Sequence, residues 1–261
     1  MPERQVYWLR DFERPDVDVY LREVAEFGVK EVFVGGYAIA EIRPGAQVSA
    51  AALAQALADT GTKVHTIHAL FAGEMDLGIV DEPGRARGLA VHETSLRVAA
   101  DLGARNVVFH IGGKQPQVAM ASVLRSVEQL LLIAEETGVD VAIENLPPGL
   151  LGAEPQDLVT IMDAFDSPRL GVCLDTGHAN MTGGCDRWLD AVGAHLNMVH
   201  LHDNLGDDDT HLPPGMGTID WPRLKTRLRE CGYPGPWVSE TRSQPGWTAA
   251  QLFAHFQEVF A

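Results

Sequence analysis

Short apolar runs alternate with longer segments of helical periodicity along the whole chain. The runs rich in β-branched and aromatic residues predict eight strands, at Gln5–Leu9, Glu31–Gly35, Lys63–His68, Asn106–His110, Val139–Glu144, Leu170–Asp175, Met198–His202 and Trp237–Glu240. The segments between and after them predict eight helices, near Val17–Phe27, Ser49–Asp59, Arg85–Leu102, Val118–Glu136, Pro155–Phe165, Asp186–His195, Trp221–Glu230 and Thr248–Phe260. Strands that alternate with helices in this way favour a parallel sheet built from βα units.

The number of βα units indicates the architecture. Eight units in 261 residues predict an α/β fold of the TIM (β/α)8 barrel type, with residues 1–261 as a single domain. An open, doubly wound sheet is the alternative. The first strand-to-helix connection, Arg10 to Asp16, carries no glycine-rich dinucleotide fingerprint, and the chain contains no P-loop. Both observations favour the barrel.

Composition limits the partners and the compartment. With 36 acidic and 20 basic residues the formal net charge is −16, so no nucleic acid partner is expected. The three cysteines, Cys173, Cys185 and Cys231, have no C-x-x-C spacing, which favours a reducing compartment. The N-terminus does not resemble a signal peptide, and no apolar run approaches the ~20 residues that span a bilayer. We therefore expect a cytoplasmic protein with no membrane partner.

Polar side chains end most of the predicted strands. These residues are His68, His110, Glu144, Asp175 and Glu240, together with His200 and His202 on the seventh strand. Side chains alternate across a strand, so His200 and His202 share one face, and each carboxylate can point inward with the apolar residue two positions earlier. The carboxyl ends of barrel strands meet at one mouth, where the active sites of TIM barrels lie.

A cluster of carboxylates and imidazoles in a partly dry mouth requires protons or a cation, because like charges repel strongly there. A divalent metal meets this need directly. Three carboxylates and one imidazole form a ligand set suited to manganese, magnesium or cobalt, and zinc becomes more favourable as further histidines join. The sequence therefore predicts a divalent metal cofactor.

Motifs at these strand ends resemble those of a known family. They are Ile143-Glu144-Asn145, Leu174-Asp175-Thr176-Gly177-His178, His200-Leu201-His202-Asp203, Asp209-Thr210-His211, Gly215-Met216-Gly217-Thr218-Ile219-Asp220-Trp221 and Ser239-Glu240. Together they resemble the xylose isomerase-like TIM barrels, which include sugar phosphate isomerases and epimerases and the apurinic endonuclease IV group. The resemblance implies that Glu144, Asp175, His200 and Glu240 bind one metal. It also implies that Glu144 and Glu240 are the catalytic acid–base pair.

The resemblance implies an isomerase or epimerase that acts on a small carbohydrate. One glutamate would remove a proton next to a carbonyl, and the other would return one to the resulting enediolate. Loss of a leaving group from that enediolate would give a sugar-acid dehydratase instead. In the nuclease branch a larger ring binds three zinc ions, and this chain has a counterpart for each member: His68, His110, Glu144, Asp175, His178, His200, Asp209, His211 and Glu240. The basic DNA-binding loops of that branch have no obvious counterpart, which favours the isomerase.

Several other residues are candidates for the substrate pocket. Trp8, Tyr37, Phe71 and Trp221 could form aromatic walls, Arg242 and Lys114 could bind a phosphate or hydroxyl groups, and His202 could bind metal or substrate. Most other histidines lie in predicted helices, and His65 has the opposite strand parity from His68. We assign these no role. A homo-oligomer that covers the mouth is compatible with the sequence, although no residue pattern demonstrates one.

Overall fold

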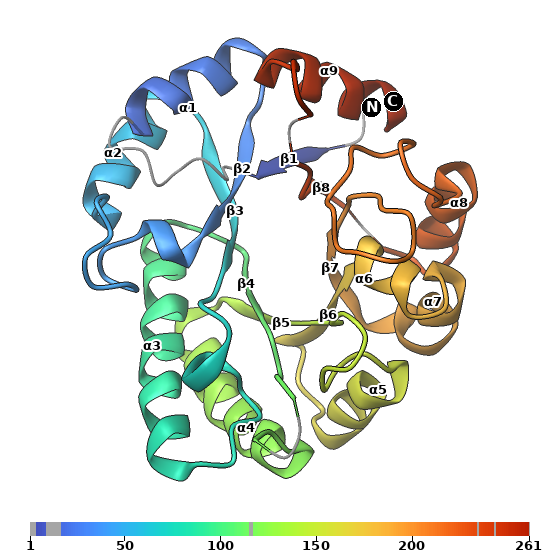
Figure 1. The fold of residues 1–261 in the computed structure, drawn as a ribbon. Helices are drawn as coiled ribbons and strands as arrows, with labels where there is room; N and C mark the ends of the chain where they lie inside the picture. Colours follow the sequence, from blue (N-terminus) through green and yellow to red (C-terminus); the bar gives the residue numbers. More distant parts are fainter. Residues whose placement is uncertain (1–3, 9–16, 115–116, 234, 243, 261) are drawn as a thin grey trace.

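The computed structural model is an eight-stranded parallel barrel surrounded by helices (Figure 1). It describes residues 4–8, 17–114, 117–233, 235–242 and 244–260. The strands are β1 Gln5–Trp8, β2 Glu31–Gly35, β3 Lys63–His68, β4 Asn106–Phe109, β5 Asp140–Glu144, β6 Leu170–Asp175, β7 Leu196–His200 and β8 Trp237–Ser239. Hydrogen bonds join them in the order β7-β6-β5-β4-β3-β2-β1-β8.

The barrel closes between the last two strands. The Leu201 N–H donates to the Val238 carbonyl at 2.8 Å, and the Glu240 N–H donates to the Leu201 carbonyl at 3.1 Å. These two bonds form a parallel bridge between Leu201 and Ser239. The predicted TIM barrel is therefore confirmed, and the open-sheet alternative is wrong.

Helices form the outer ring of the barrel in Figure 1. The α-helices are α1 Val17–Glu26, α2 Ala50–Thr60, α3 Glu82–Asp101, α4 Met120–Thr137, α5 Pro155–Ala164, α6 Thr176–Met181, α7 Cys185–Val192, α8 Trp221–Glu230 and α9 Ala249–Val259. Three 3-10 turns accompany them: η1 Gly36–Ala38, η2 Gly73–Met75 and η3 Gly193–His195. Helix α3 begins three residues before the prediction because the Asp81 side chain accepts the Gly84 N–H and caps it. The sequence analysis missed the short helix α6.

The predicted seventh strand, Met198–His202, is displaced by two residues. The turn η3 ends at His195, so β7 begins at Leu196 and ends at His200. Beyond it, Leu201 bonds to β8, and Asp203 pairs with Leu212 in an antiparallel bridge. The prediction that His202 lies on the strand is therefore wrong.

Other predicted strand ends shift by one residue. His110 and Glu240 come directly after β4 and β8 instead of ending them, and the fifth strand begins at Asp140 instead of Val139. Leu9, the predicted end of the first strand, lies outside the described residues.

Two apolar layers make up the core. The barrel interior contains one residue from nearly every strand: Val6, Phe33, Val108, Ala142, Cys173, Met198 and Val238. A larger cluster fills the space between strands and helices. Interior residues precede Glu144, Asp175 and Glu240 by two positions, so the predicted inward orientation of these three carboxylates is confirmed. Met198 stands in the same relation to His200.

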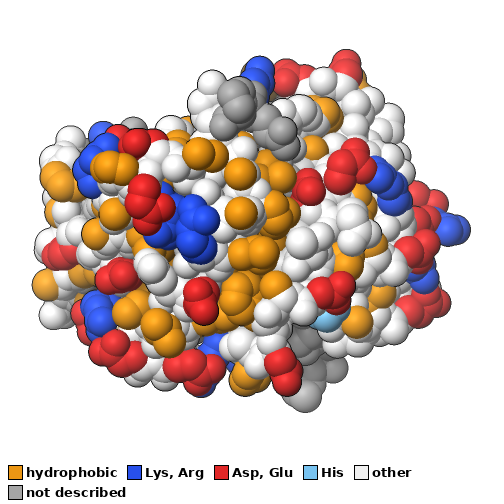
Figure 2. All heavy atoms as spheres, turned by 90° about the horizontal axis from the view of Figure 1, so that it is seen from below, with side chains coloured by type: hydrophobic (Ala, Val, Ile, Leu, Met, Phe, Trp, Pro, Cys, Tyr) orange, Lys and Arg blue, Asp and Glu red, His pale blue; other side chains and the backbone are white. Residues whose placement is uncertain are grey.

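The outer wall on the α3–α5 side carries both signs of charge. Figure 2 shows acidic and basic side chains interspersed there, with hydrophobic side chains gathered toward the middle of the face. Leu132 on α4 is 68% exposed, the largest exposure among the large hydrophobic residues that the structure describes. Within the same described residues, no helix has the length and apolarity needed to cross a membrane.

Candidate metal centre

Four side chains converge at the carboxyl end of the barrel. Glu144 ends β5, Asp175 ends β6, His200 ends β7 and Glu240 follows β8. Each offers one ligand atom, and these four atoms all lie within 4.8 Å of one another. All four residues are buried. The structure thus brings together the single-metal set that the sequence resemblance implied.

The imidazole of His200 lies between the two glutamates. Its Nδ1 atom is 3.0 Å from Glu144 Oε1 and 3.1 Å from Glu240 Oε2. Burial alone would raise the pKa of each glutamate, but the neighbouring imidazoles outweigh it and hold both pKa values below the ordinary range. Burial opposes a charge on His200, yet the surrounding acidic groups raise its pKa well above the ordinary value. The two carboxylates are therefore anionic, and the neighbouring imidazoles stabilise their charge.

A second group of potential ligands lies beside Glu144. The Nε2 atoms of His68 and His110 are each 3.1 Å from Glu144 Oε2. Burial lowers the pKa of His110, and the attraction of Glu144 offsets this only in part. The Phe71 ring stacks on His110 at a centroid distance of 4.4 Å. One ligand atom from each of His68, His110 and Glu144 lies within 4.8 Å of the other two.

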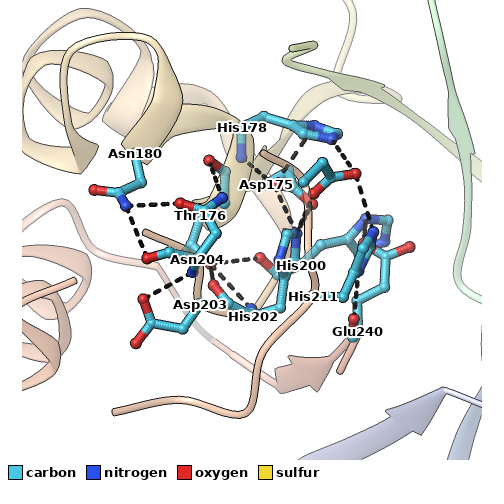
Figure 3. Close-up of polar contacts among 12 residues, drawn as sticks. Asp175, Thr176, His178, Asn180, His200, His202, Asp203, Asn204, His211 and Glu240 are labelled. Carbon is cyan, nitrogen blue, oxygen red and sulfur yellow. Dashed lines mark hydrogen bonds and ion pairs between the residues drawn. The ribbon is translucent and has the colours of Figure 1, made fainter. Parts of the chain in front are cut away.

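A third group consists of His178, Asp209 and His211, of which Figure 3 labels the two histidines. Asp209 Oδ2 is 3.5 Å from His178 Nε2 and 3.1 Å from His211 Nε2. Burial opposes protonation of His178, but Asp175, Asp209 and Glu144 raise its pKa to about 10. The two imidazoles hold the pKa of Asp209 below its ordinary value against the effect of burial. All nine members of the larger ring therefore belong to one connected site.

Hydrogen bonds from Asn145 and from helix α6 hold Asp175 in place. Asn145 accepts the Asp175 N–H at 2.7 Å and donates to its carbonyl oxygen at 2.9 Å. Asp175 Oδ1 accepts the His178 N–H at 2.7 Å and so caps helix α6. These contacts hold the backbone of Asp175 and one of its two carboxylate oxygens.

A cavity of about 510 Å³ opens above these residues. Trp8, Tyr37, Phe71 and Arg242 line it, as the sequence analysis expected of a substrate pocket. Trp221 does not, because it is buried and its indole N–H donates to Asp203 instead. Lys114 and His202 are also absent from the described lining, in which Arg242 is the only Lys or Arg.

Asp76 is a lining residue that the sequence analysis missed. It is 7% exposed, and its Oδ1 atom accepts the Ala72 N–H at 3.1 Å. Burial raises its pKa. Ala72 has a φ of +72°, a strained conformation for a non-glycine residue. The Asp-Leu-Gly sequence after the third strand was the available signal, but the reach of its carboxylate into the mouth depends on the loop.

The ligand chemistry fits a hard or borderline divalent cation. Carboxylate oxygens with one or more imidazole nitrogens suit manganese, magnesium, cobalt and zinc. The buried carboxylates also need a positive charge, which the histidines supply in this structure. The residues are therefore suited to hold such an ion.

Comparison with known proteins agrees with the fold. Residues 21–258 match the family described as the xylose isomerase-like TIM barrel. The chain belongs to this family. The match confirms the resemblance drawn from the strand-end motifs.

Curated relatives of this xylose isomerase-like TIM barrel include uncharacterized proteins and sugar epimerases. An uncharacterized protein from Methanocaldococcus jannaschii is 31% identical over 182 residues, which cover 65% of this chain and 61% of that protein. The chain thus spans about three fifths of that relative, and about half of the next two. The L-ribulose-5-phosphate 3-epimerase UlaE of Salmonella paratyphi A is 24% identical over 211 residues, which cover 77% of this chain and 73% of that enzyme.

Solved structures share the fold over nearly the full length. A D-tagatose 3-epimerase-like protein superposes with a TM-score of 0.81 at 22% identity, covering 98% of this chain and 95% of that one. The IOLI protein, solved with a bound zinc atom, superposes with a TM-score of 0.78 at 17% identity, covering 98% and 96%. At these identities the likeness establishes the fold of the xylose isomerase-like TIM barrel.

Proposed function

We propose that this protein is a divalent-metal-dependent isomerase or epimerase of a sugar or sugar phosphate. The observation that carries the proposal is the placement of Glu144 and Glu240, whose carboxylates both lie within 3.1 Å of the Nδ1 atom of His200. Inversion of a stereocentre by proton transfer uses one such group on each face of the substrate carbon, whereas isomerisation moves the proton to the neighbouring carbon. The sugar epimerases among the relatives and structural neighbours support the same reaction class.

The metal would be held by Glu144, Asp175, His200 and Glu240. When bound, a divalent cation at this position would polarise a substrate carbonyl and stabilise the negative charge that develops on its oxygen. One glutamate removes the proton on the adjacent carbon, and the other returns a proton. Return to the opposite face of the same carbon gives an epimer, whereas return to the neighbouring carbon gives the aldose–ketose isomer.

The cavity walls support a small carbohydrate as substrate. Aromatic rings of Trp8, Tyr37 and Phe71 offer apolar faces for sugar carbons, while Asp76 and Arg242 offer polar atoms for hydroxyl groups. The volume of about 510 Å³ lies in the range of ordinary ligand pockets. Arg242 is also the described lining residue best suited to a phosphate.

The test combines metal analysis with product analysis in heavy water. Protein purified without chelators should contain about one divalent metal per chain. D-tagatose, D-fructose and L-ribulose 5-phosphate are suitable first substrates, because they or their epimerases appear among the similar proteins. Products formed in D2O should carry deuterium at the inverted or newly protonated carbon. A protein that binds no divalent metal would refute the proposal.

A second candidate is a phosphodiesterase with several zinc ions. It is favoured by one observation: the ligand atoms of His68, His110 and Glu144 lie close enough together to hold a further cation beside the four-residue set. The acidic net charge of −16 argues against a nucleic acid substrate. Three zinc ions per chain and cleavage of a duplex with an abasic site would establish this activity.

A dehydration product from a sugar acid would instead indicate the lyase reaction.

A further inference from the structure

His202 is a buried histidine whose imidazole is hydrogen-bonded to Asp175, one of the carboxylates of the candidate metal centre. Its Nε2 atom lies 3.0 Å from Asp175 Oδ1 and 2.9 Å from Asp175 Oδ2, and both residues are 0% exposed (Figure 3). An ionised carboxylate only accepts hydrogen bonds, so Nε2 carries the proton and donates. Within the described residues, Nδ1 has no hydrogen-bond partner. Nε2 is therefore the atom through which the ring is held.

The backbone of His202 is tied to the residue that follows Asp175. The His202 N–H donates to Thr176 Oγ1 at 3.1 Å, and the Thr176 hydroxyl donates to the His202 carbonyl at 2.7 Å. These two bonds connect the loop after β7 to the start of α6. They set the distance between the imidazole and the carboxylate independently of the imidazole–carboxylate bond itself.

Two neighbours fix the plane of the imidazole. The His211 ring stacks on it with a centroid distance of 4.0 Å and an interplanar angle of 17°. On the α6 side, a Cβ at Gly177 would overlap the Cε1 atom of His202. The absence of a side chain at position 177 therefore leaves the space that the ring occupies.

We propose that His202 is a positioning residue that orients the Asp175 carboxylate toward the metal, and that Gly177 makes room for it. This inference rests on the metal centre proposed above. A carboxylate that rotates freely loses conformational entropy when it binds a cation, and this loss weakens binding. A carboxylate that a hydrogen-bond donor already holds has a smaller entropy cost. Loss of such a donor typically weakens metal binding by about 10- to 100-fold.

The test is a titration of metal-free protein with Mn²⁺ at pH 7, in which the free ion is followed by electron paramagnetic resonance. His202→Leu removes the donor, and we expect the dissociation constant to rise by about 10- to 100-fold. His202→Gln offers an amide N–H near the position of Nε2, so it should recover much of this loss. Gly177→Ala changes none of the donor or ligand residues, but its methyl group displaces the His202 ring. It should therefore weaken Mn²⁺ binding as His202→Leu does.

His92→Leu is the matched control, because His92 is also a buried histidine but its Nε2 atom bonds to the Met75 carbonyl instead of a proposed ligand. It should leave Mn²⁺ affinity unchanged, and thermal unfolding of each metal-free variant reports its folding. If His202→Leu or Gly177→Ala changes the melting temperature alone, with Mn²⁺ affinity intact, the inference is wrong. If the wild type binds more than one Mn²⁺ per chain, and His202→Leu loses one of these ions with unchanged affinity for the others, His202 is a metal ligand and the inference is wrong. A wild-type protein that binds no Mn²⁺ refutes the proposed function itself.

Discussion

The Nδ1 atom of His200 lies 3.0 Å from Glu144 Oε1 and 3.1 Å from Glu240 Oε2. One imidazole nitrogen thus marks the point where the ends of β5, β7 and β8 meet. Each of these three side chains follows an interior residue by two positions and points the same way. The interior residues are Ala142, Met198 and Val238. The centre is therefore a direct extension of the barrel interior.

Replacement of either glutamate should abolish turnover. Glu144→Gln and Glu240→Gln each remove a proton-transfer group and a charged ligand while nearly preserving shape. We expect activity to fall by at least about 10²- to 10⁴-fold, the usual contribution of general acid–base catalysis. Steady-state kinetics with metal content measured in parallel tests this. Glu258→Gln, an exposed residue on α9, is the control and should retain full activity. Near-normal rates in either site variant would disprove the assigned roles.

Metal binding should release protons. In the metal-free site the surrounding acidic groups raise the pKa of His200 well above its ordinary value, so the ring is protonated at pH 7. A cation requires the neutral ring, and its binding therefore expels about one proton. Affinity should rise with pH, by about tenfold per unit for each proton released. Calorimetric titrations in two buffers of different ionisation enthalpy measure the number. Equal heats in both buffers would contradict the expected release.

Strand alternation was sufficient to predict that the carboxylates at the ends of β5 and β6 and after β8 point into the mouth. Ala142 and Glu144, or Cys173 and Asp175, lie two positions apart and point the same way, as a period of two requires. Binary patterning carries this information because a buried charged side chain is costly unless a partner or a cation compensates it.

The contacts between strands could not be predicted in this way. The pairing of β6 with β7 shifts between Val172 and Cys173, which places Asn197 outside the simple register. Nothing in local hydrophobicity reveals such a bulge. The contact of His202 with Asp175 and the approach of Asp76 to the cavity depend on loop conformations, which arise from tertiary hydrogen bonds such as those of Thr176 and Ala72.

Acid should destabilise the protein partly through His92. Burial lowers its pKa to about 4, whereas an unfolded chain has a value of about 6.5. The unfolded state then binds the proton more readily, so stability is lost as the pH falls from 6.5 toward 4. This linkage costs about 2 kcal/mol between pH 7 and pH 5.

His92→Gln removes that titration and can keep a donor to the Met75 carbonyl. Urea unfolding at pH 7 and pH 5 should therefore show a smaller pH effect in the variant than in the wild type. His65, whose pKa is also lowered to about 4 by burial, remains in both proteins and contributes equally to each. Parallel pH profiles would show that His92 does not contribute.

Gly88 allows helix α3 to approach the loop that carries Asp76. A Cβ at this position would overlap the carbonyl oxygen of Glu74 in η2, and backbone does not move aside as a flexible side chain does. Alanine favours a helix over glycine by about 1 kcal/mol, but overpacking costs about 1–3 kcal/mol and the rigid contact places this site toward the upper end. We therefore expect Gly88→Ala to lower the free energy of unfolding by about 2 kcal/mol and the melting temperature by about 4–8 °C. Gly35→Ala is the control, since a Cβ there meets no atom within 4 Å, and calorimetry should find it nearly as stable as the wild type. Equal melting temperatures for the two variants would mean that the loop yields to α3.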